Sequence, residues 1–457
     1  MSEFDGLQIA LSSLYAQQKA LQVTGQNIAN VNTDGYSRQR VEMSANSGPI
    51  TPARESRYTG PGMGVTTGDT TRITDQFLEL RGYQEHAVQA GLQQSQSVLS
   101  DVELAFDEPS NDGLSKLISG FMASFDDLAN APDDNSARTA VVQQGQTLVD
   151  GFNQLDSALA TQRSSAINEL GSQIDEVNTE ASQVAALNHS IASAVANGDS
   201  PNALMDQRDQ LVSKLAGEVG VTVRPGDIDG TIDVFVGGTA LVRGAVANPL
   251  QMDVGTDPAQ TVHVTWANDG YPAGVTGSTG GLLSGVNDVI PRYRSGLQAV
   301  AQQLAGQINA VHSTGYALDG STDRDFFTTD ASGRIEVNPA IVADPSLVAA
   351  SGSAGATRDG SVAQKIADLS GAADGYQQLV TGLGVESAGV NRKVAVQASV
   401  VQNIDDAQQS VSGVNLDEEM TAMLQYQHGY DAAARFLTAI DEALSTLINS
   451  TGIVGRT

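Results

Sequence analysis

The chain has 457 residues, a formal net charge of −29 at pH 7 and no cysteine. The acidic balance argues against binding to nucleic-acid phosphates and to anionic membrane surfaces. The lack of cysteine excludes disulfides, thiolate catalysis and cysteine zinc sites, and it fits a protein that works outside the cell without an oxidising folding step.

The first residues carry no secretory signal. The opening MSEFDGLQIALSSL has two acidic residues and no early Lys or Arg, so the basic segment of a cleaved signal peptide is missing. No apolar run reaches the roughly 18 residues of a membrane span, so no membrane insertion is predicted. We expect a protein that either stays in the cytosol or is exported without a cleaved signal peptide.

Residues 4–30 have the period of a long helix. Apolar or small residues recur at steps of three and four, which places them on one heptad-like stripe. The predicted stripe contains Leu7, Leu11, Leu14, Leu21 and Ile28.

The helix is followed by a segment rich in turn-forming residues. Asparagine and threonine side chains bond nearby backbone, and Asp34-Gly35 favours a turn, so we interpret this segment as a structural joint. Its residues are Ala29, Asn30, Asn32, Thr33, Gly35 and Tyr36. Residues 36–72 look extended, with turns at 47–50 and 60–64, and Arg38 and Arg40 alternate where they could meet acids on a neighbour.

The middle of the chain alternates between long helical patterns and short strands. Helices are predicted over 74–106, 136–196, 283–311 and 379–411. Five short runs with period-2 alternation over 221–270 predict one small antiparallel β unit, and a second strand-like region spans 314–360 with GRIEV inside it.

The C-terminal segment mirrors the first helix. Asn415 is placed to cap a helix whose first turn is acidic, as the helix dipole favours. Its stripe contains Met420, Met423, Tyr430, Leu437 and Leu444. Because both terminal helices carry an apolar stripe, we predict that they pair with each other.

These patterns predict a mainly α fold with β insertions. Paired N- and C-terminal helices would form a coiled-coil-like stalk, next to a long-helix bundle domain and a small antiparallel β domain. We divide the chain into an N-terminal helix (1–35), an extended or β-hairpin joint (36–75), a long-helix bundle (76–215), a small β domain (216–275), a helix returning to the bundle (276–313), a β-rich or irregular outer segment (314–360), a further bundle helix (361–411) and the C-terminal helix (412–457).

No motif for catalysis, cofactor binding or metal binding emerges. The five histidines lie far apart, and no glycine-rich segment follows a strand and opens a helix. Two acidic loops resemble calcium ligands, one with Asp227, Asp229 and Asp233 and one with Asp319, Asp323 and Asp325, but neither has the glycine and glutamate of an EF-hand. Solvated turns are the favoured interpretation of both loops, and whether they bind calcium stays open.

The segment ANVNTDGYSR (29–38) resembles the signature of the axial proteins of the bacterial flagellum, the rod, hook and hook-associated proteins. That signature places Ala-Asn-x-x-Thr-x-Gly-Tyr after an N-terminal helix. Asp34 stands where the family often has Pro, and Asp-Gly also forms turns. Residues 412–449, 279–320 and 60–81 are further similar to the hook-associated protein 1 branch of this family, and the likeness is weakest over 130–275.

The resemblance implies a structural protein with no enzymatic activity and no cofactor. It implies a hook–filament junction subunit outside the cell, exported without a cleaved signal and assembled through its terminal helices. The implied partners are further copies in a ring, the hook protein, a second hook–filament junction protein and an export chaperone on the C-terminal helix. We expect residues 1–30 and 420–457 to be mobile in the free monomer, because their stripes are thin and long isolated helices are marginal in water.

Two alternatives stay open at this point. One is another axial protein, a hook or rod subunit that polymerises into long tubes. The other is an extracellular enzyme on a helical stalk, with its active module in residues 216–360, where the sequence shows only scattered acids.

Overall fold

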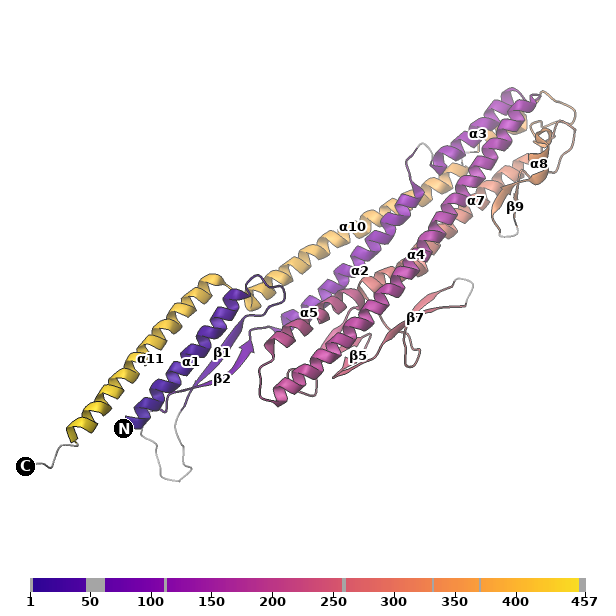
Figure 1. The fold of residues 1–457 in the computed structure, drawn as a ribbon. Coiled ribbons are helices and arrows are strands. Elements are labelled where there is room, and N and C mark those ends of the chain that lie inside the picture. Colours follow the sequence, from indigo (N-terminus) through magenta and orange to yellow (C-terminus); the bar gives the residue numbers. More distant parts are fainter. Residues whose placement is uncertain are drawn as a thin grey trace, which may run out of the picture.

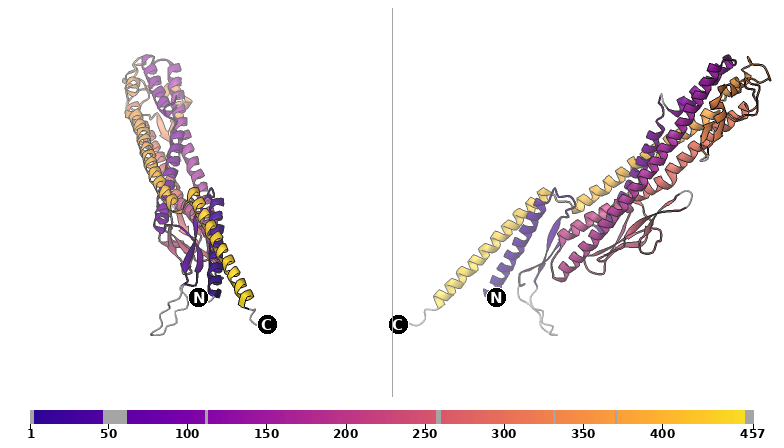
Figure 2. Two further views of the ribbon diagram at one scale, coloured as in Figure 1. Left: turned by 90° about the vertical axis from the view of Figure 1, so that its left-hand side faces the viewer. Right: turned by 45° about the vertical axis from the view of Figure 1, so that its right-hand side comes forward.

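The computed structural model describes residues 3–46, 62–110, 113–256, 260–330, 333–369 and 371–451. The turn predicted at 47–50 and the first residues of the turn predicted at 60–64 lie outside these ranges. The described residues form an elongated molecule, with a helix pair at one end and a long bundle toward the other (Figures 1 and 2).

The first and last helices of the chain lie side by side. They are α1 (Glu3–Ala29) and α11 (Leu416–Thr451). Both views of Figure 2 place this pair at one end of the molecule, and α1 also contacts a hairpin of β1 (Gln39–Ala45) and β2 (Val65–Arg72). The predicted pairing of the terminal helices is confirmed.

The bundle is built from long helices that run along the molecule (Figure 1). Its helices are α2 (Gln76–Phe106), α3 (Leu114–Asn130), α4 (Asn135–Ala196), α5 (Asn202–Val219), α6 (Gly277–Ser284), a π-helical turn (Gly285–Val289) that leads into α7 (Ile290–His312), and α10 (Gly371–Ser412). With 62 residues, α4 is about 90 Å long and forms the spine of the bundle.

Several bundle helices differ from the sequence-based prediction. No helix is predicted over 202–219, which forms α5. None is predicted over 114–130, although Leu114, Ile118, Phe121 and Phe125 follow the helical period and are buried. The helix predicted from residue 379 begins at Gly371. The local pattern is weak at the start of α10, because about half of the side chains described in this helix are exposed and its apolar periodicity is low.

The strands of 221–270 form two sheets and not the single unit that was predicted. One sheet has the order β3 (Thr222–Pro225), β4 (Ile232–Val236), β5 (Thr239–Arg243) and β6 (Val246–Ala247), and a separate hairpin pairs β7 (Leu250–Val254) with β8 (Val262–Trp266). Both sheets pack against α4, and each is attached to it separately, because Asn188 bonds Ile232 of β4 and Asn178 bonds Leu250 of β7.

The far end of the bundle holds the second strand-like region. It contains β9 (Phe327–Thr329), β10 (Ile335–Val337), α8 (Pro339–Ala343), a 3₁₀ turn (Pro345–Leu347) and α9 (Ser361–Ala367). The strand expected within GRIEV is confirmed as β10. A cluster of four phenylalanines, with the buried ring of His312 against it, fills this end: Phe121, Phe125, Phe326 and Phe327.

Asparagine side chains join the helices to the strands. An asparagine amide offers one donor group and one acceptor, so it can pair with the N–H and C=O of a single residue as a neighbouring strand would. Five helical asparagines do this, at 2.7–3.3 Å. The pairs are Asn27 with Gln39, Asn178 with Leu250, Asn188 with Ile232, Asn287 with Val262 and Asn309 with Phe327.

Candidate functional site: the terminal helix pair and its joint

The terminal helices run antiparallel with small residues at the contact. Gly6 of α1 lies opposite Ile440, and Gln17 lies opposite Gly429. A Cβ atom on Gly6 would approach Ile440 to 3.1 Å, so glycine permits the close approach of the two helices. Alanine provides much of the buried surface of α1, at positions Ala10, Ala16 and Ala20.

The leucine stripe of α1 is not the face that the chain buries. Leu7, Leu14, Leu21 and Ile28 are half-buried, and Leu11 is exposed. The alanine row lies beside this stripe on the helix surface. It is buried because α11 and the β1–β2 hairpin approach α1 from neighbouring directions. The predicted leucine stripe therefore lies beside the most deeply buried row of α1.

The other helix of the pair is exposed on most of its surface. Among the α11 side chains whose burial is described, Glu419 and Ala433 are buried, while Met423, Leu437 and Leu444 are half-buried. Large apolar side chains of the pair remain in contact with solvent. We call them the terminal-pair apolar surface: Leu11, Tyr15, Leu416, Met420, Leu424, Tyr430, Phe436, Leu447 and Ile448.

Three members of this surface form a row on one side of α11. Leu416, Met420 and Leu424 are spaced four residues apart, which places them along one helix face, and they are 45–53 % exposed. Glu419 and Ala433 mark the side of α11 that faces α1. The row therefore lies on a different side of α11 from the contact with α1.

Asn27 is the centre of the joint between the helix pair and the rest of the molecule. Its Nδ2 donates to the Gln39 carbonyl at 3.0 Å and to Glu419 Oε2 at 3.1 Å. Its Oδ1 accepts from the Gln39 N–H at 3.0 Å and from the Tyr36 hydroxyl at 2.8 Å. The buried amide thus uses all four of its hydrogen-bonding positions, and it connects α1, the hairpin and α11.

A buried carboxylate completes the joint. Glu419 accepts from Arg38 Nε at 2.7 Å and is 3 % exposed, whereas Glu418 accepts from Arg38 Nη1 at 2.8 Å and is 59 % exposed. The acids expected to meet Arg38 on a neighbouring molecule therefore lie in the same chain, nearly four hundred residues away. Burial, together with the nearby carboxylates of Asp206 and Glu419, raises the pKa of Tyr36 to about 12, so its hydroxyl remains a donor.

The predicted turn residues shape the chain around this centre. The Asn30 side chain donates to the Gln26 carbonyl, and Thr33 Oγ1 donates to Asn30 Oδ1. Gly35 has a φ of +73°, which glycine adopts without strain, and the Gln210 side chain lies where a Cβ would project. Ala29 and Asn32 are exposed.

The opposite side of the hairpin is held by α5. Arg72 Nη1 donates to Asp206 at 3.0 Å and to Asp209 at 2.7 Å, and Arg208 also pairs with Asp209. The Gln210 side chain donates to the Asp34 carbonyl, which attaches the turn itself to α5. Sequence reasoning missed Asn27, Glu419, Arg72 and the pair of Asp206 and Asp209, because the partners of these residues are remote in sequence. The one available signal was that the chain contains acids and arginines that could pair.

Neither of the two acidic loops considered for calcium forms a close group of three carboxylates. Among the described residues, three carboxylates come within 4.8 Å of one another at one place, where Glu176 and Glu180 of α4 meet Glu218 of α5. No described helix is both long and apolar enough to cross a membrane.

Comparison with known proteins decides the family. A model described as the helical domain of flagellar hook-associated protein FlgK matches residues 99–327. Models of the flagellar rod proteins match both ends, at 7–36 and 407–450. Flagellar hook-associated protein 1 of Bacillus subtilis is 31 % identical over the full length of both chains. The chain belongs to the flagellar hook-associated protein 1 family.

Other relatives agree with this assignment. Flagellar hook-associated protein 1 of Salmonella typhimurium is 27 % identical, covering 96 % of this chain and 98 % of its own. The solved flagellar hook junction protein FlgK from Burkholderia pseudomallei is 25 % identical, with a TM-score of 0.50 over 55 % of this chain and 47 % of that one. The present hook-associated protein is accordingly a hook–filament junction protein, a structural component of the flagellar axis and not an enzyme.

Proposed function

We propose that the terminal helix pair is the surface through which this protein assembles with further copies and with adjacent axial subunits at the junction. The observation that carries the proposal is the terminal-pair apolar surface, whose side chains are 40–67 % exposed. Exposed large apolar side chains favour association, because packing them together removes them from water. The predicted residues Leu11, Met420 and Tyr430 belong to this surface, and the half-buried leucines border it.

The proposed occupants of this surface are a ring of identical subunits, the hook protein on one side and a second hook–filament junction protein on the other. Before assembly, an export chaperone on α11 would cover the same apolar side chains, and the protein would leave the cell without a cleaved signal peptide. The exposure of α11 supports both roles, since α1 packs along one side of this helix and most of its other side chains are exposed and available to a partner.

The joint would set the angle between the assembled helix pair and the outward bundle. Asn27, Arg38 and Glu419 bring α1, α11 and the hairpin together, while Arg72 and Gln210 attach the hairpin and its turn to α5. Because every one of these contacts is directional, the joint favours one orientation over a free hinge.

Replacing two members of the exposed row tests the assembly proposal. The double variant Met420→Ser/Leu424→Ser should fold like the wild-type monomer, because both side chains are exposed, yet it should fail to cap hook fragments viewed by electron microscopy. The matched control is Val246→Ser/Tyr271→Ser, which removes two exposed apolar side chains from the β region. Normal capping by the double variant would refute the proposal.

Deletion of residues 412–457 separates assembly from export. The shortened protein should leave cells without attached filaments. If the segment also binds the chaperone, less protein should reach the medium of a strain that lacks hooks. Cells that swim with normal filaments after this deletion would contradict the assigned role of α11.

A further inference from the structure

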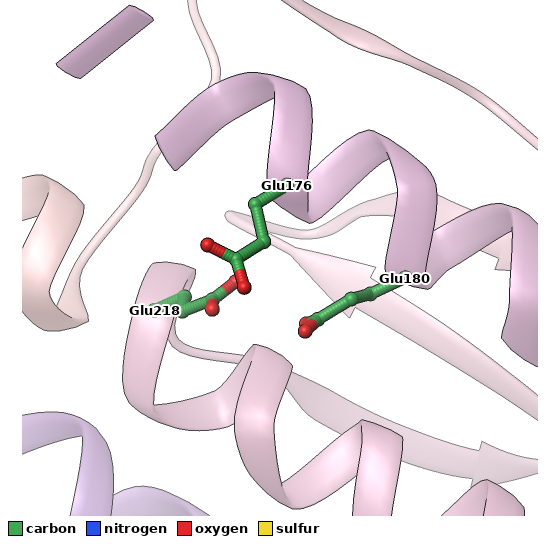
Figure 3. Close-up of side chains that lie close together, drawn as sticks. All are labelled: Glu176, Glu180 and Glu218. Atoms are coloured by element: carbon green, nitrogen blue, oxygen red, sulfur yellow. The ribbon is translucent and has the colours of Figure 1, made fainter. Parts of the chain in front are cut away.

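Three glutamates and one lysine meet where α4 packs against α5. Figure 3 shows Glu176 and Glu180 reaching from α4 toward Glu218 on α5, and their nearest carboxylate oxygens all lie within 4.8 Å of one another. Lys214 Nζ lies 2.5 Å from Glu176, 2.5 Å from Glu180 and 3.8 Å from Glu218. Three carboxylates therefore share one ammonium group.

Two carboxylate oxygens of this cluster have no hydrogen-bond donor. Glu180 and Glu218 are 5 % and 17 % exposed, and Oε2 of each is buried without a partner. The adjoining helix α6 carries no ionisable residue, and its Ser278 hydroxyl bonds to the Glu218 backbone carbonyl instead. On α2, Ala90 and Ala87 lie near Gly217 and Gly220 at this end of α5. The charges that act on the Glu218 carboxyl are those of Glu180, Lys214 and Glu176.

A pair of buried carboxylates with one unsatisfied oxygen each is stabilised by a shared proton. We propose that Glu218 is protonated in the native protein at neutral pH and donates a hydrogen bond to Glu180, so that loss of this proton in alkali weakens the contact between α4 and α5. The proposal concerns the fold of the monomer and does not depend on the assembly proposal.

The electrostatic surroundings agree with this geometry. Burial, followed by the charge of Glu180, raises the pKa of the Glu218 carboxyl to about 8, and the Lys214 ammonium opposes the rise only in part. The shared lysine also explains why a proton is favoured over a metal ion: Lys214 already occupies the position between Glu176 and Glu180 that a divalent cation would take.

A weaker contact between α4 and α5 would also affect the joint, because α5 connects the two. The same helix presents Asp206, Asp209 and Gln210 to the hairpin and to the turn after α1. Glu218 lies at the C-terminal end of α5, about two to three turns from these residues. We infer that alkaline pH loosens the attachment of the joint to the bundle while the rest of the α4 core stays packed.

The sign of the pH effect follows from the raised pKa. The native state keeps a proton on Glu218 that the unfolded chain releases near pH 4.5. The contribution of this carboxyl to the free energy of unfolding therefore falls as pH rises from about 4.5 to about 8, and it stays constant above pH 8. Glu218→Gln keeps a neutral donor at every pH. The ratio of the wild-type to the variant unfolding constant should therefore rise by up to about tenfold per pH unit in that window.

The experiment is chemical denaturation of the full-length protein between pH 5 and 9, with hydrogen exchange of the α5 amides at pH 7 and 9 corrected for intrinsic rates. Wild type should lose α5 protection at the higher pH and Glu218→Gln should not. Asp175→Asn, which removes an exposed charge from α4, the helix that carries Glu176 and Glu180, should behave like wild type. If Glu218→Gln does not fold, Glu180→Gln should show the same flattened pH dependence.

Two results would overturn the proposal. One is a Glu218→Gln protein, or a Glu180→Gln protein in its place, with the pH dependence of wild type. The other is recovery of α5 protection at pH 9 when Mg²⁺ or Ca²⁺ is added to wild type, since that would make the cluster a cation site.

Discussion

At the scale of single residues, polar side chains with fully used hydrogen-bonding groups hold this protein together where its apolar contacts are thin. Asn27 satisfies four partners, and Glu419 is buried only because Arg38 and Asn27 donate to it. Removing one member of such a group leaves the others unsatisfied, which costs more than the bond itself contributes.

The neighbouring residues Glu418 and Glu419 make a matched pair for testing the joint. Glu419→Gln should destabilise the attachment of α11 by about 2–3 kcal/mol, because Arg38 then loses its buried counter-charge. Glu418→Gln should cost less than about 1 kcal/mol, since that pair is exposed to solvent. Hydrogen exchange of residues 36–45 and 416–430 measures the difference; equal effects of the two substitutions would contradict the assigned role of Glu419.

The asparagine pairing of strands to helices can be tested at Asn178. Asn178→Asp replaces the donor that bonds the Leu250 carbonyl with a second acceptor, so we expect a loss of about 2 kcal/mol in the free energy of unfolding. Asn168→Asp on the exposed side of the same helix is the control. Urea denaturation, together with hydrogen exchange of residues 250–266, reports the loss, and a control as unstable as Asn178→Asp would argue against it.

At the scale of helices and strands, the two ends of the molecule are held in different ways. The bundle end has a core of aromatic and aliphatic side chains, whereas the terminal pair has alanine, glycine and a few hydrogen bonds. Small side chains bury little apolar area, so their contribution to stability is small.

The terminal pair should therefore open far more readily than the bundle. In the free monomer we expect the amides of residues 3–30 and 420–451, the described part of the two ends predicted to be mobile, to exchange orders of magnitude faster than those of the central part of α4, because local opening follows local packing. Exchange on hook-bound protein should be slow in both regions. Full protection of the terminal helices in the monomer would show that intrachain contacts suffice to hold them.

The far end of the bundle should be sensitive to acid. His312 is buried, donates from Nδ1 to the Arg324 carbonyl and accepts at Nε2 from the Ala349 N–H, and burial lowers its pKa to about 4. Stability from this group is fully present above pH 6.5 and falls by about 3 kcal/mol as pH drops to 4, since the unfolded chain takes up the proton first.

Thermal unfolding between pH 4 and 7 measures this decline. His428→Gln, which alters an exposed histidine, should leave it unchanged, whereas His312→Gln should flatten it and lower stability at pH 7. An unaltered acid profile in the His312 variant would exclude this residue as its source.

At the scale of the whole molecule, the proposed assembly brings together copies of an elongated protein, each with a charge of −29. Like charges oppose that approach, and salt screens them over about 10 Å at 0.1 M ionic strength. At higher salt the repulsion between subunits is therefore weaker, while the apolar contacts proposed between them remain.

Assembly should thus accelerate with ionic strength. We expect the rate at which purified protein caps hook fragments, followed by electron microscopy or light scattering, to increase between 0.02 and 0.3 M NaCl, whereas the fold of the monomer measured by circular dichroism should not change. Neutral osmolyte at equal osmolarity serves as the control. A rate that falls with salt would mean that attraction between opposite charges dominates the contact.

The sequence by itself determined the helices with strong period, the caps, the turn after α1 and the pairing of the two terminal helices. Asn415 caps α11 as predicted, and Asp75 and Asp134 cap α2 and α4. These features depend on residues close together in the chain, and their signals are local. The family could also be predicted from the sequence, because its motif is the contiguous segment 29–38.

Only the tertiary structure decided which face of α1 is buried, that the strands of 221–270 split into two sheets, and that Asn27 and Arg38 meet Glu419. A helix with leucines on one side and alanines on the next can bury either side, and the choice depends on which one its neighbours approach. A single glutamate in an acidic helix start has the same local pattern whether it faces water or a buried arginine. The partner that distinguishes the two lies 381 residues away, so no local signal specifies it.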